Sequence, residues 1–236
     1  MWGRCFAPAV RQPLPMTLRH RQDFPCTPPQ LFTPLHRVHP DFRTLLPTSE
    51  GFIVTASCSV FIATSLDGFI ARSDGSIDWL NQANHAVTPG EDCGYGCFMA
   101  DVDVLVMGRN TFEQVLGFDA WPYGTKEVIV LTRRDISLPS HLPPCVSVSR
   151  ETPEALVARL SARGVRKIYV DGGQTIQGFL AAGLIEELTI TVIPVLLGAG
   201  KPLFGPLSAD VHLRHESTTA FDFGFVQNRY RVVRDA

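Results

Sequence analysis

From residue 52 onward, short β-rich runs alternate with short helical segments along most of the chain. Runs at 54–63, 101–107, 127–132, 145–149, 166–170 and 187–195 have the apolar or β-branched character of buried strands. Helices are expected at 111–116, 153–164 and 175–182. Two further β-rich runs, 211–218 and 225–233, follow one another directly. This order predicts an α/β fold with a mostly parallel sheet and an antiparallel C-terminal edge.

The first 52 residues differ in composition from the rest of the chain. They contain nine of the eighteen prolines and six arginines, but few acidic residues. Proline has no backbone N–H and a fixed φ, so this density disfavours helices and central strands. We therefore expect 1–52 to be a disordered extension and 53–236 to form one folded domain. A cytoplasmic location is expected, and organelle targeting by the arginine-rich start is the alternative.

Composition excludes several classes of partner. The chain is 45% hydrophobic with a formal net charge of -2, which predicts a globular protein with no nucleic-acid surface. It has no apolar run long enough for a membrane span. Cys93 and Cys97 are four residues apart, but no CxxC motif or paired histidine lies nearby, so we expect no metal site.

Two strand-to-helix junctions share one pattern. The run ending at Met107 leads into Gly108-Arg109-Asn110-Thr111, and the run ending at Val170 leads into Asp171-Gly172-Gly173-Gln174-Thr175. The first turn of a helix has unpaired N–H groups and a partial positive charge, and glycine allows an anion to approach the backbone closely. A glycine at such a junction is also common for purely structural reasons, and neither segment fits GxGxxG. Together, the two turns form a candidate diphosphate site.

Five motifs, in this order, resemble the dihydrofolate reductase superfamily, and in particular stand-alone relatives of the riboflavin-pathway (RibD) reductase domain. They are FIATSLDGFIA (61–71), MGRNTFEQV (107–115), KEVIVLTRR (126–134), IYVDGGQTIQGFL (168–180) and ITVIPVLLGAGKPLF (190–204). The resemblance spans roughly residues 57–233. It implies a three-layer α/β/α fold, NADPH as cofactor, hydride transfer to a pteridine- or pyrimidine-like heterocycle, and a homodimer.

The resemblance also implies which residues contact NADPH. Backbone groups of Ala63 and Ile70 would approach the nicotinamide, and Asp67 and Gly68 would shape the turn between them. The phosphate groups would be held by Gly108, Arg109 and Thr111 in the first turn, and by Gly172, Gly173, Gln174 and Thr175 in the second. Thr132 and Arg133 would lie at the adenosine 2′-phosphate.

The residues after 131 favour NADP over NAD independently of the resemblance. An NAD site usually places an acidic side chain against the ribose 2′-hydroxyl. Here the sequence is Thr132-Arg133-Arg134, whose positive charge suits a phosphate. Asp135 weakens this argument, and a solvated loop of mixed charge is the alternative.

The proton donor and the substrate contacts are less constrained by sequence. Asp92 lies at the distance from Gly108 at which folate-reducing relatives carry a carboxylate, but it could equally be part of a helix start. His85 and Tyr95 are lesser candidates. Asp78 and Trp79 are expected to line the substrate side.

The substrate class is narrowed by one departure from the folate enzymes. Those enzymes carry an arginine for the glutamate tail of folate where this chain has Thr125-Lys126, so dihydrofolate is a less favoured substrate. The resemblance implies the riboflavin-pathway substrate, a phosphoribosylamino-pyrimidine, as one candidate, although the deaminase signature of bifunctional relatives is absent. An NADPH-binding sensor of the same fold, without turnover, is the alternative function.

Overall fold

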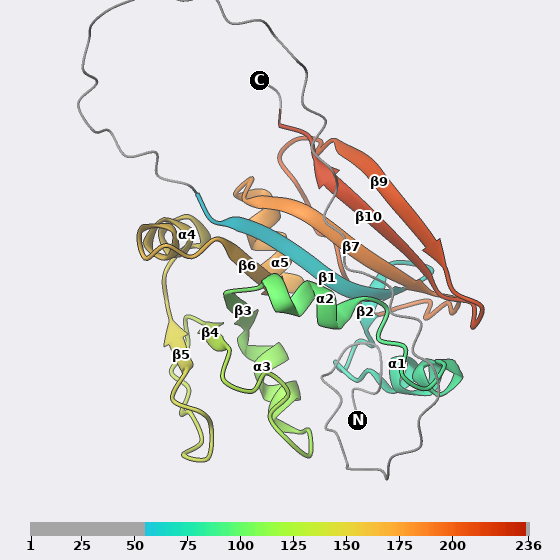
Figure 1. Cartoon of the computed structure of the whole chain (residues 1–236), viewed down its shortest axis with the longest axis horizontal. Coiled ribbons are helices and arrows are strands. Elements are labelled where there is room, and N and C mark those ends of the chain that lie inside the picture. The colour runs from blue at the N-terminus through green and yellow to red at the C-terminus, as the bar shows by residue number, and fades with distance from the viewer. Residues whose placement is uncertain (1–54, 235–236) are drawn as a thin grey trace, which may run out of the picture. The chain divides into compact units, whose positions relative to one another are not determined.

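The computed structural model describes residues 55–234 and places them in a doubly covered sheet. The extension expected at 1–52 lies outside these residues. Eight strands pair in the order β5-β4-β3-β6-β1-β7-β10-β9 (Figure 1). They are β1 (Ser57–Ser65), β3 (Val104–Gly108), β4 (Glu127–Leu131), β5 (Val146–Ser149), β6 (Lys167–Asp171), β7 (Ile185–Ile193), β9 (Leu213–Ala220) and β10 (Val226–Val232). All pairings are parallel except β10 with β7 and with β9, which are antiparallel.

The strands and the antiparallel edge expected from sequence are therefore confirmed. Three expected helices are also present: α3 (Arg109–Leu116), α4 (Pro153–Ala162) and α5 (Gly173–Ala181). The helix start left open around Asp92 is also present, as α2 (Tyr95–Asp101). Four short elements were not expected from the sequence: β2 (Phe69–Ala71), β8 (Lys201–Pro202), α1 (Asp78–Ala83) and the 3₁₀ turn η1 (Asn84–Ala86). Each is too short to show a clear hydrophobic period.

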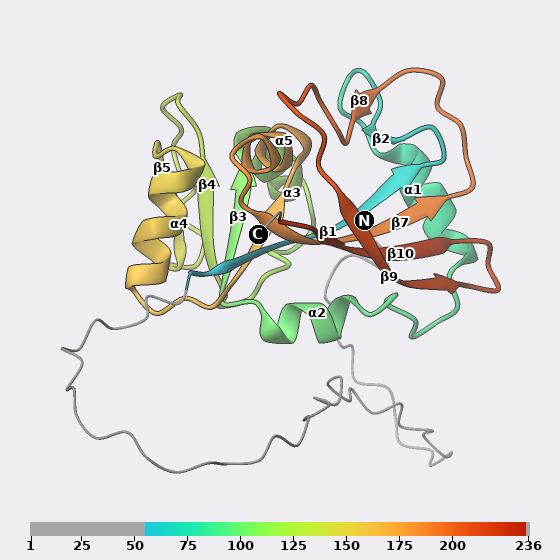
Figure 2. The same ribbon diagram turned by 90° about the horizontal axis from the view of Figure 1, so that it is seen from above.

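The core consists of two apolar clusters, one on each face of the sheet. Alternate residues of each strand point to opposite faces. Thus Phe61 and Ala63 of β1 pack in one cluster with α1 and α2, which we call the α2 face. Val60 and Ile62 pack in the other cluster with α4 and α5. Figure 2 shows α2 and α5 on opposite sides of the sheet, as a three-layer fold requires.

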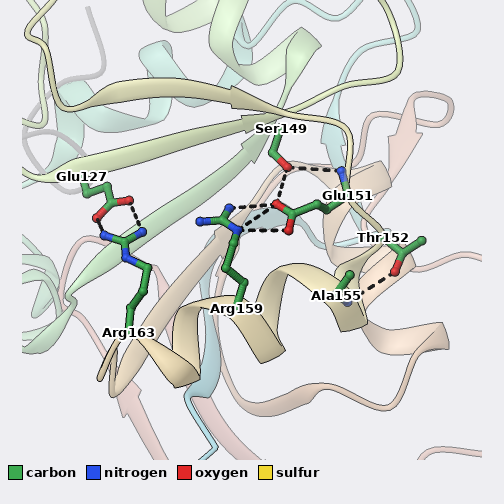
Figure 3. A network of polar contacts seen from close by, with 7 residues as sticks. All are labelled: Glu127, Ser149, Glu151, Thr152, Ala155, Arg159 and Arg163. Atoms are coloured by element: carbon green, nitrogen blue, oxygen red, sulfur yellow. Dashed lines mark hydrogen bonds and ion pairs between the residues drawn. The ribbon is translucent and has the colours of Figure 1, made fainter.

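The start of α4 shows how local sequence fixes an element. Thr152 Oγ1 accepts a hydrogen bond of 3.3 Å from the backbone N–H of Ala155, and Pro153 occupies the first turn (Figure 3). Arg163, just after the helix, forms an ion pair of 2.8 Å with Glu127 of β4 (Figure 3). The cap and the ion pair hold α4 in register with the sheet.

Replacing Thr152 by alanine is expected to lower the free energy of unfolding by about 1 kcal/mol, because an N-terminal donor of α4 loses its acceptor. Thr152→Ser keeps the hydroxyl and is the matched control. Urea unfolding followed by circular dichroism measures both variants. Equal stability of the alanine and serine variants would contradict a capping role.

No helix within residues 55–234 combines the length and the apolar character that crossing a lipid bilayer requires.

Candidate functional site

The carboxyl ends of three neighbouring strands meet at one edge of the sheet. Gly108 at the end of β3 is in register with Leu131 at the end of β4. On its other side, Met107 of β3 is in register with Asp171, the last residue of β6. Parallel neighbours must end at the same edge, so both glycine turns start side by side. This edge is where open α/β sheets bind ligands.

The two glycine turns approach each other so closely that neither has room for a side chain. A Cβ atom on Gly108 would lie 2.7 Å from Thr175 Oγ1, which is on the first turn of α5. A Cβ atom on Gly172 would collide with Thr111 Oγ1, on the first turn of α3. Gly172 also has φ of +89°, a region that disfavours side chains. Each turn thus requires glycine because of a hydroxyl from the other.

Both helices that leave these turns begin without a side-chain cap. The N-cap residues are Gly108 for α3 and Gly172 for α5, and neither makes a side-chain hydrogen bond. The N–H groups of two adjacent helix starts therefore lie beside the hydroxyls of Thr111 and Thr175. Such a pair of N-termini suits a group with two negative charges. Arg109 adds a guanidinium at the same place and forms an ion pair of 2.8 Å with Glu113.

The loops beyond β1 and β7 are held together by one carboxylate. Asp67 accepts hydrogen bonds from Ser65 Oγ (2.6 Å) and from the backbone N–H of Gly198 (2.7 Å). The first of these bonds makes the largest contribution to lowering the pKa of the Asp67 carboxyl. Gly68 follows with φ of +83°, so the predicted turn between Ala63 and Ile70 is present. A Cβ atom on Gly173 would lie 2.7 Å from Ile70 Cδ1, so this loop packs against the second glycine turn.

The residues that follow β4 present unpaired positive charge. Among residues 55–234, neither Arg133 nor Arg134 forms an ion pair, and both are exposed. Thr132 Oγ1 accepts a hydrogen bond of 3.1 Å from the Arg134 N–H, which shapes the turn. Asp135 is paired with Arg150 instead of with its arginine neighbours. Asp135, which weakened the argument for a 2′-phosphate site, is thus neutralised by Arg150 and not by Arg133 or Arg134.

Asp171 is a buried acid at this site that sequence reasoning missed. It is 4% exposed, and its Oδ1 accepts a hydrogen bond of 2.8 Å from the Gly172 N–H. Burial raises the pKa of the Asp171 carboxyl to about 6. By strand alternation, Asp171 lies on the same face of β6 as Tyr169, which belongs to the cluster on the α2 face. The only signal in the sequence is an acidic residue directly before the Gly-Gly pair.

The charge of Asp171 acts on three buried tyrosines. Burial raises the pKa of Tyr95, Tyr123 and Tyr169, and the Asp171 charge adds to each of these shifts. Tyr169 Oη donates a hydrogen bond of 2.9 Å to the Phe61 carbonyl. The three tyrosines therefore stay protonated around neutral pH, whereas Asp171, with its pKa of about 6, changes its charge there.

Asp92 lies at the start of α2 as a capping residue. Its two oxygens accept hydrogen bonds of 2.8 Å from the backbone N–H groups of Gly94 and Gly96. This is the helix-start arrangement that the sequence left open as an alternative to a proton-donor role. Of the two lesser candidates, His85 is exposed in η1, and Tyr95 is buried.

Asp78 and Trp79, both expected on the substrate side, have different environments. Asp78 is exposed at the start of α1 and forms an ion pair of 2.6 Å with Arg72. Trp79 is 4% exposed within the cluster on the α2 face, and its indole Nε1 has no hydrogen-bond partner among residues 55–234. Within the same residues, no three histidine, cysteine or acidic side chains gather as a metal site would require.

Comparison with known proteins identifies the family. The family model that matches is described as the RibD C-terminal domain, and it covers residues 57–227. This chain belongs to the RibD C-terminal domain family. The match includes both glycine turns, the end of β4 and the loops that Asp67 joins.

Relatives and solved structures agree with this family. The uncharacterized protein YwjB of Bacillus subtilis is 39% identical over 165 residues, which are 69% of this chain and 90% of that protein. A crystal structure named as a riboflavin biosynthesis protein of Shewanella sp. PV-4 has 40% identity and a TM-score of 0.70, and the alignment covers 75% of this chain and 99% of that one. Acinetobacter baumannii RibD shares the fold at 18% identity and a TM-score of 0.59, over 76% of this chain and 59% of its own. The RibD-type reductase fold expected from sequence is confirmed.

Proposed function

We propose that this RibD C-terminal domain protein is an NADPH-dependent reductase of a pteridine- or pyrimidine-like heterocycle. The observation that carries the proposal is the pair of glycine turns at 108 and 172. In each turn, a threonine hydroxyl from the other turn occupies the space that a side chain would need. Two adjacent helix starts without side-chain caps provide N–H donors for a diphosphate, and Thr111 and Thr175 provide hydroxyls. A Cβ atom at either turn would displace one of these hydroxyls.

The residues along the carboxyl edge fit the parts of NADPH in order. Arg133 and Thr132 at the end of β4 would bind the 2′-phosphate, and the two turns at β3 and β6 would bind the diphosphate. The loop from Ala63 to Ile70, which Asp67 holds in place, would bind the nicotinamide. When bound, the cofactor supplies the hydride. The protein's contribution is to hold the two reactants in one orientation.

We propose Asp171 as the group that holds a proton beside the reacting atoms. It is the buried carboxyl nearest the second turn, and its pKa of about 6 allows the protonated form to persist close to neutral pH. Asp92, the acid expected from sequence, has both oxygens engaged by the start of α2. A carboxylate occupied by two backbone donors is poorly placed to donate a proton itself.

A phosphoribosylamino-pyrimidine is the preferred substrate. A solved relative from Thermotoga maritima carries a name that includes 5-amino-6-(5-phosphoribosylamino)uracil reductase, although at 16% identity it supports only the fold. Dihydrofolate is less favoured because Lys126, at the position of the folate-tail arginine, donates a hydrogen bond of 2.5 Å to the Val102 carbonyl. Its ammonium group is thus already engaged.

The reductase proposal is tested by following NADPH absorbance with the full-length chain and a panel of aminopyrimidines and dihydropterins. We expect NADPH to raise the unfolding temperature and at least one substrate to be reduced. Stabilisation by NADPH without turnover on any member of the panel would favour the NADPH sensor. Absence of both effects would reject the proposal.

Arg133→Ala is expected to weaken NADPH binding by roughly tenfold and to leave NADH binding almost unchanged, because only NADPH carries the 2′-phosphate. Isothermal titration of both dinucleotides measures the ratio. Arg150→Ala is the matched control, since this nearby arginine is paired with Asp135. An equal loss for NADH and NADPH would contradict a 2′-phosphate contact.

We also propose that the chain forms a homodimer. All eight residues of β9 are exposed, so the last strand of the sheet is left open to a second copy. Light scattering after size-exclusion chromatography should give twice the monomer mass of 26.0 kDa. A single species at the monomer mass would contradict this proposal.

A further inference from the structure

Four buried side-chain atoms on one short helical segment lack hydrogen-bond partners. The segment is α1 followed by η1, residues 78–86. Among residues 55–234, no partner exists for Trp79 Nε1, for Asn81 Oδ1 or for either polar atom of the Asn84 carboxamide. Trp79 and Asn84 are each only 4% exposed. Buried polar groups nearly always find a partner, so a gathering of four such atoms needs an explanation.

The backbone of this segment does not explain the unpaired atoms. The N–H at Asn84 is satisfied by the carbonyls of Leu80 and Gln82. The start of the segment is fixed by the ion pair between Asp78 and Arg72. The unmet hydrogen bonds therefore belong to side chains on an ordered helical turn.

Trp79 lies on the side of the sheet where Asp171 points. Leu80 and Asn84 are four residues apart and share one helical face. Leu80 and Trp79 pack in the cluster on the α2 face together with Ala63 at the end of β1. Asp171 lies on that same face of the sheet, next to the glycine turn. Trp79, at the start of the segment, and Asp171 thus lie on the same face of the sheet.

The donors and acceptors among the unpaired atoms match the edge of a lactam ring. A carboxamide offers one acceptor and two donors in a single plane, which match the adjacent N–H and C=O of a lactam. Trp79 Nε1 can donate to a further ring carbonyl, and Asn81 Oδ1 can accept from an amino group or a second ring N–H. We infer that Asn84, together with Trp79 and Asn81 of the same segment, binds the lactam edge of a flat heterocyclic substrate. This inference rests on the proposed reductase function and identifies a residue that determines its substrate class.

The test uses lumazine, a fluorescent pteridine-2,4-dione, and 1,3-dimethyllumazine, which lacks both ring N–H donors of the lactam edge. Fluorescence titration of the full-length chain gives the affinity for each. Asn84→Leu removes the carboxamide at similar volume, and Gln82→Leu, on an exposed position of the same helix, is the matched control. NADPH affinity and unfolding temperature are measured for every variant.

We expect the wild type to bind lumazine at least about tenfold more tightly than the dimethyl form. Asn84→Leu should lose this preference, retain NADPH affinity and show an unfolding temperature equal to or above that of the wild type, since it removes unpaired buried groups. Gln82→Leu should behave as the wild type. Thermal shift with NADPH reports separately on the proposed function.

Several results would overturn the inference while leaving NADPH binding intact. They are unchanged lumazine affinity in Asn84→Leu, equal affinity of the wild type for the two probes, or no binding of either. A marked fall in the unfolding temperature of Asn84→Leu would also overturn it, because the carboxamide would then be satisfied in the free protein. Absence of NADPH binding by the wild type would instead reject the proposed function.

Discussion

Gly172→Ala is expected to weaken NADPH binding by roughly a hundredfold, which corresponds to about 2.7 kcal/mol. The added methyl group would collide with Thr111 Oγ1, and the backbone at φ +89° disfavours any side chain. Relief of the collision must rotate the Thr111 hydroxyl away or displace the start of α3 or of α5, and each of these changes disturbs the donors of the site. Isothermal titration with NADPH measures the loss.

Gly183→Ala is the matched control, because Gly183 also has positive φ (+66°), but an added methyl group there would meet nothing within 4 Å. It should cost stability through strain and leave NADPH affinity unchanged. Gly108→Ala is a second test if Gly172→Ala folds poorly. Its φ of -80° is ordinary, so only the contact with Thr175 opposes the side chain. NADPH affinity unaffected in both turn variants would show that the turns do not hold the cofactor.

Asp171→Asn is expected to lower the turnover number by about 10²–10⁴-fold, the usual contribution of a proton-transferring side chain. The amide keeps the acceptor for the Gly172 N–H but cannot deliver the proton. In the wild type, the rate should fall as the pH rises through about 6, because the protonated form is the active one. The variant should lack this dependence.

Asp171→Asn is expected to lower turnover but to raise the free energy of unfolding. The Asp171 pKa is raised from 3.8 to about 6 by burial, so its contribution to stability is complete below 3.8 and is lost as the pH rises through 6. At pH values well above 6, Asp171→Asn should be more stable than the wild type by up to about 3 kcal/mol. The two proteins should be equally stable in acid. Urea unfolding at both pH values measures the difference.

Asp92→Asn tests whether Asp92 or Asp171 donates the proton. Asparagine can still accept one hydrogen bond from the start of α2, so the variant should fold and retain nearly full turnover. A slow Asp92→Asn enzyme beside a fully active Asp171→Asn enzyme would reverse the assignment and restore the acid expected from sequence.

Much of the fold could be predicted because parallel strands buried on both faces are continuous apolar runs. The runs that became β3 and β6 are of this kind, and each is followed by a glycine turn that marks its end. The α1 segment was missed for a physical reason. It has six residues and no side-chain cap at Ile77, so its helical state depends on tertiary packing of Trp79 and Leu80.

The site was predictable only where backbone geometry determines the residue. Glycine at 108 and 172 is required by close approach, and that requirement is visible in the motif. Asp171 and Asn84 were missed because burial, not residue type, makes them unusual. The role of Asp92 could not be predicted for a different reason. The sequence near a helix start is the same whether an acidic residue caps the helix or donates a proton.

The most direct test of the paired-turn site is an NADPH titration of the full-length chain labelled with ¹⁵N-glycine, followed by amide NMR. Nineteen glycines give one signal each, and single glycine-to-alanine variants at 108, 172, 173, 183 and 224 assign the signals that are followed. We predict that the signals of Gly108, Gly172 and Gly173 shift on NADPH addition, while Gly183 and Gly224 do not. Saturating NADPH that leaves all three turn signals in place would contradict the account.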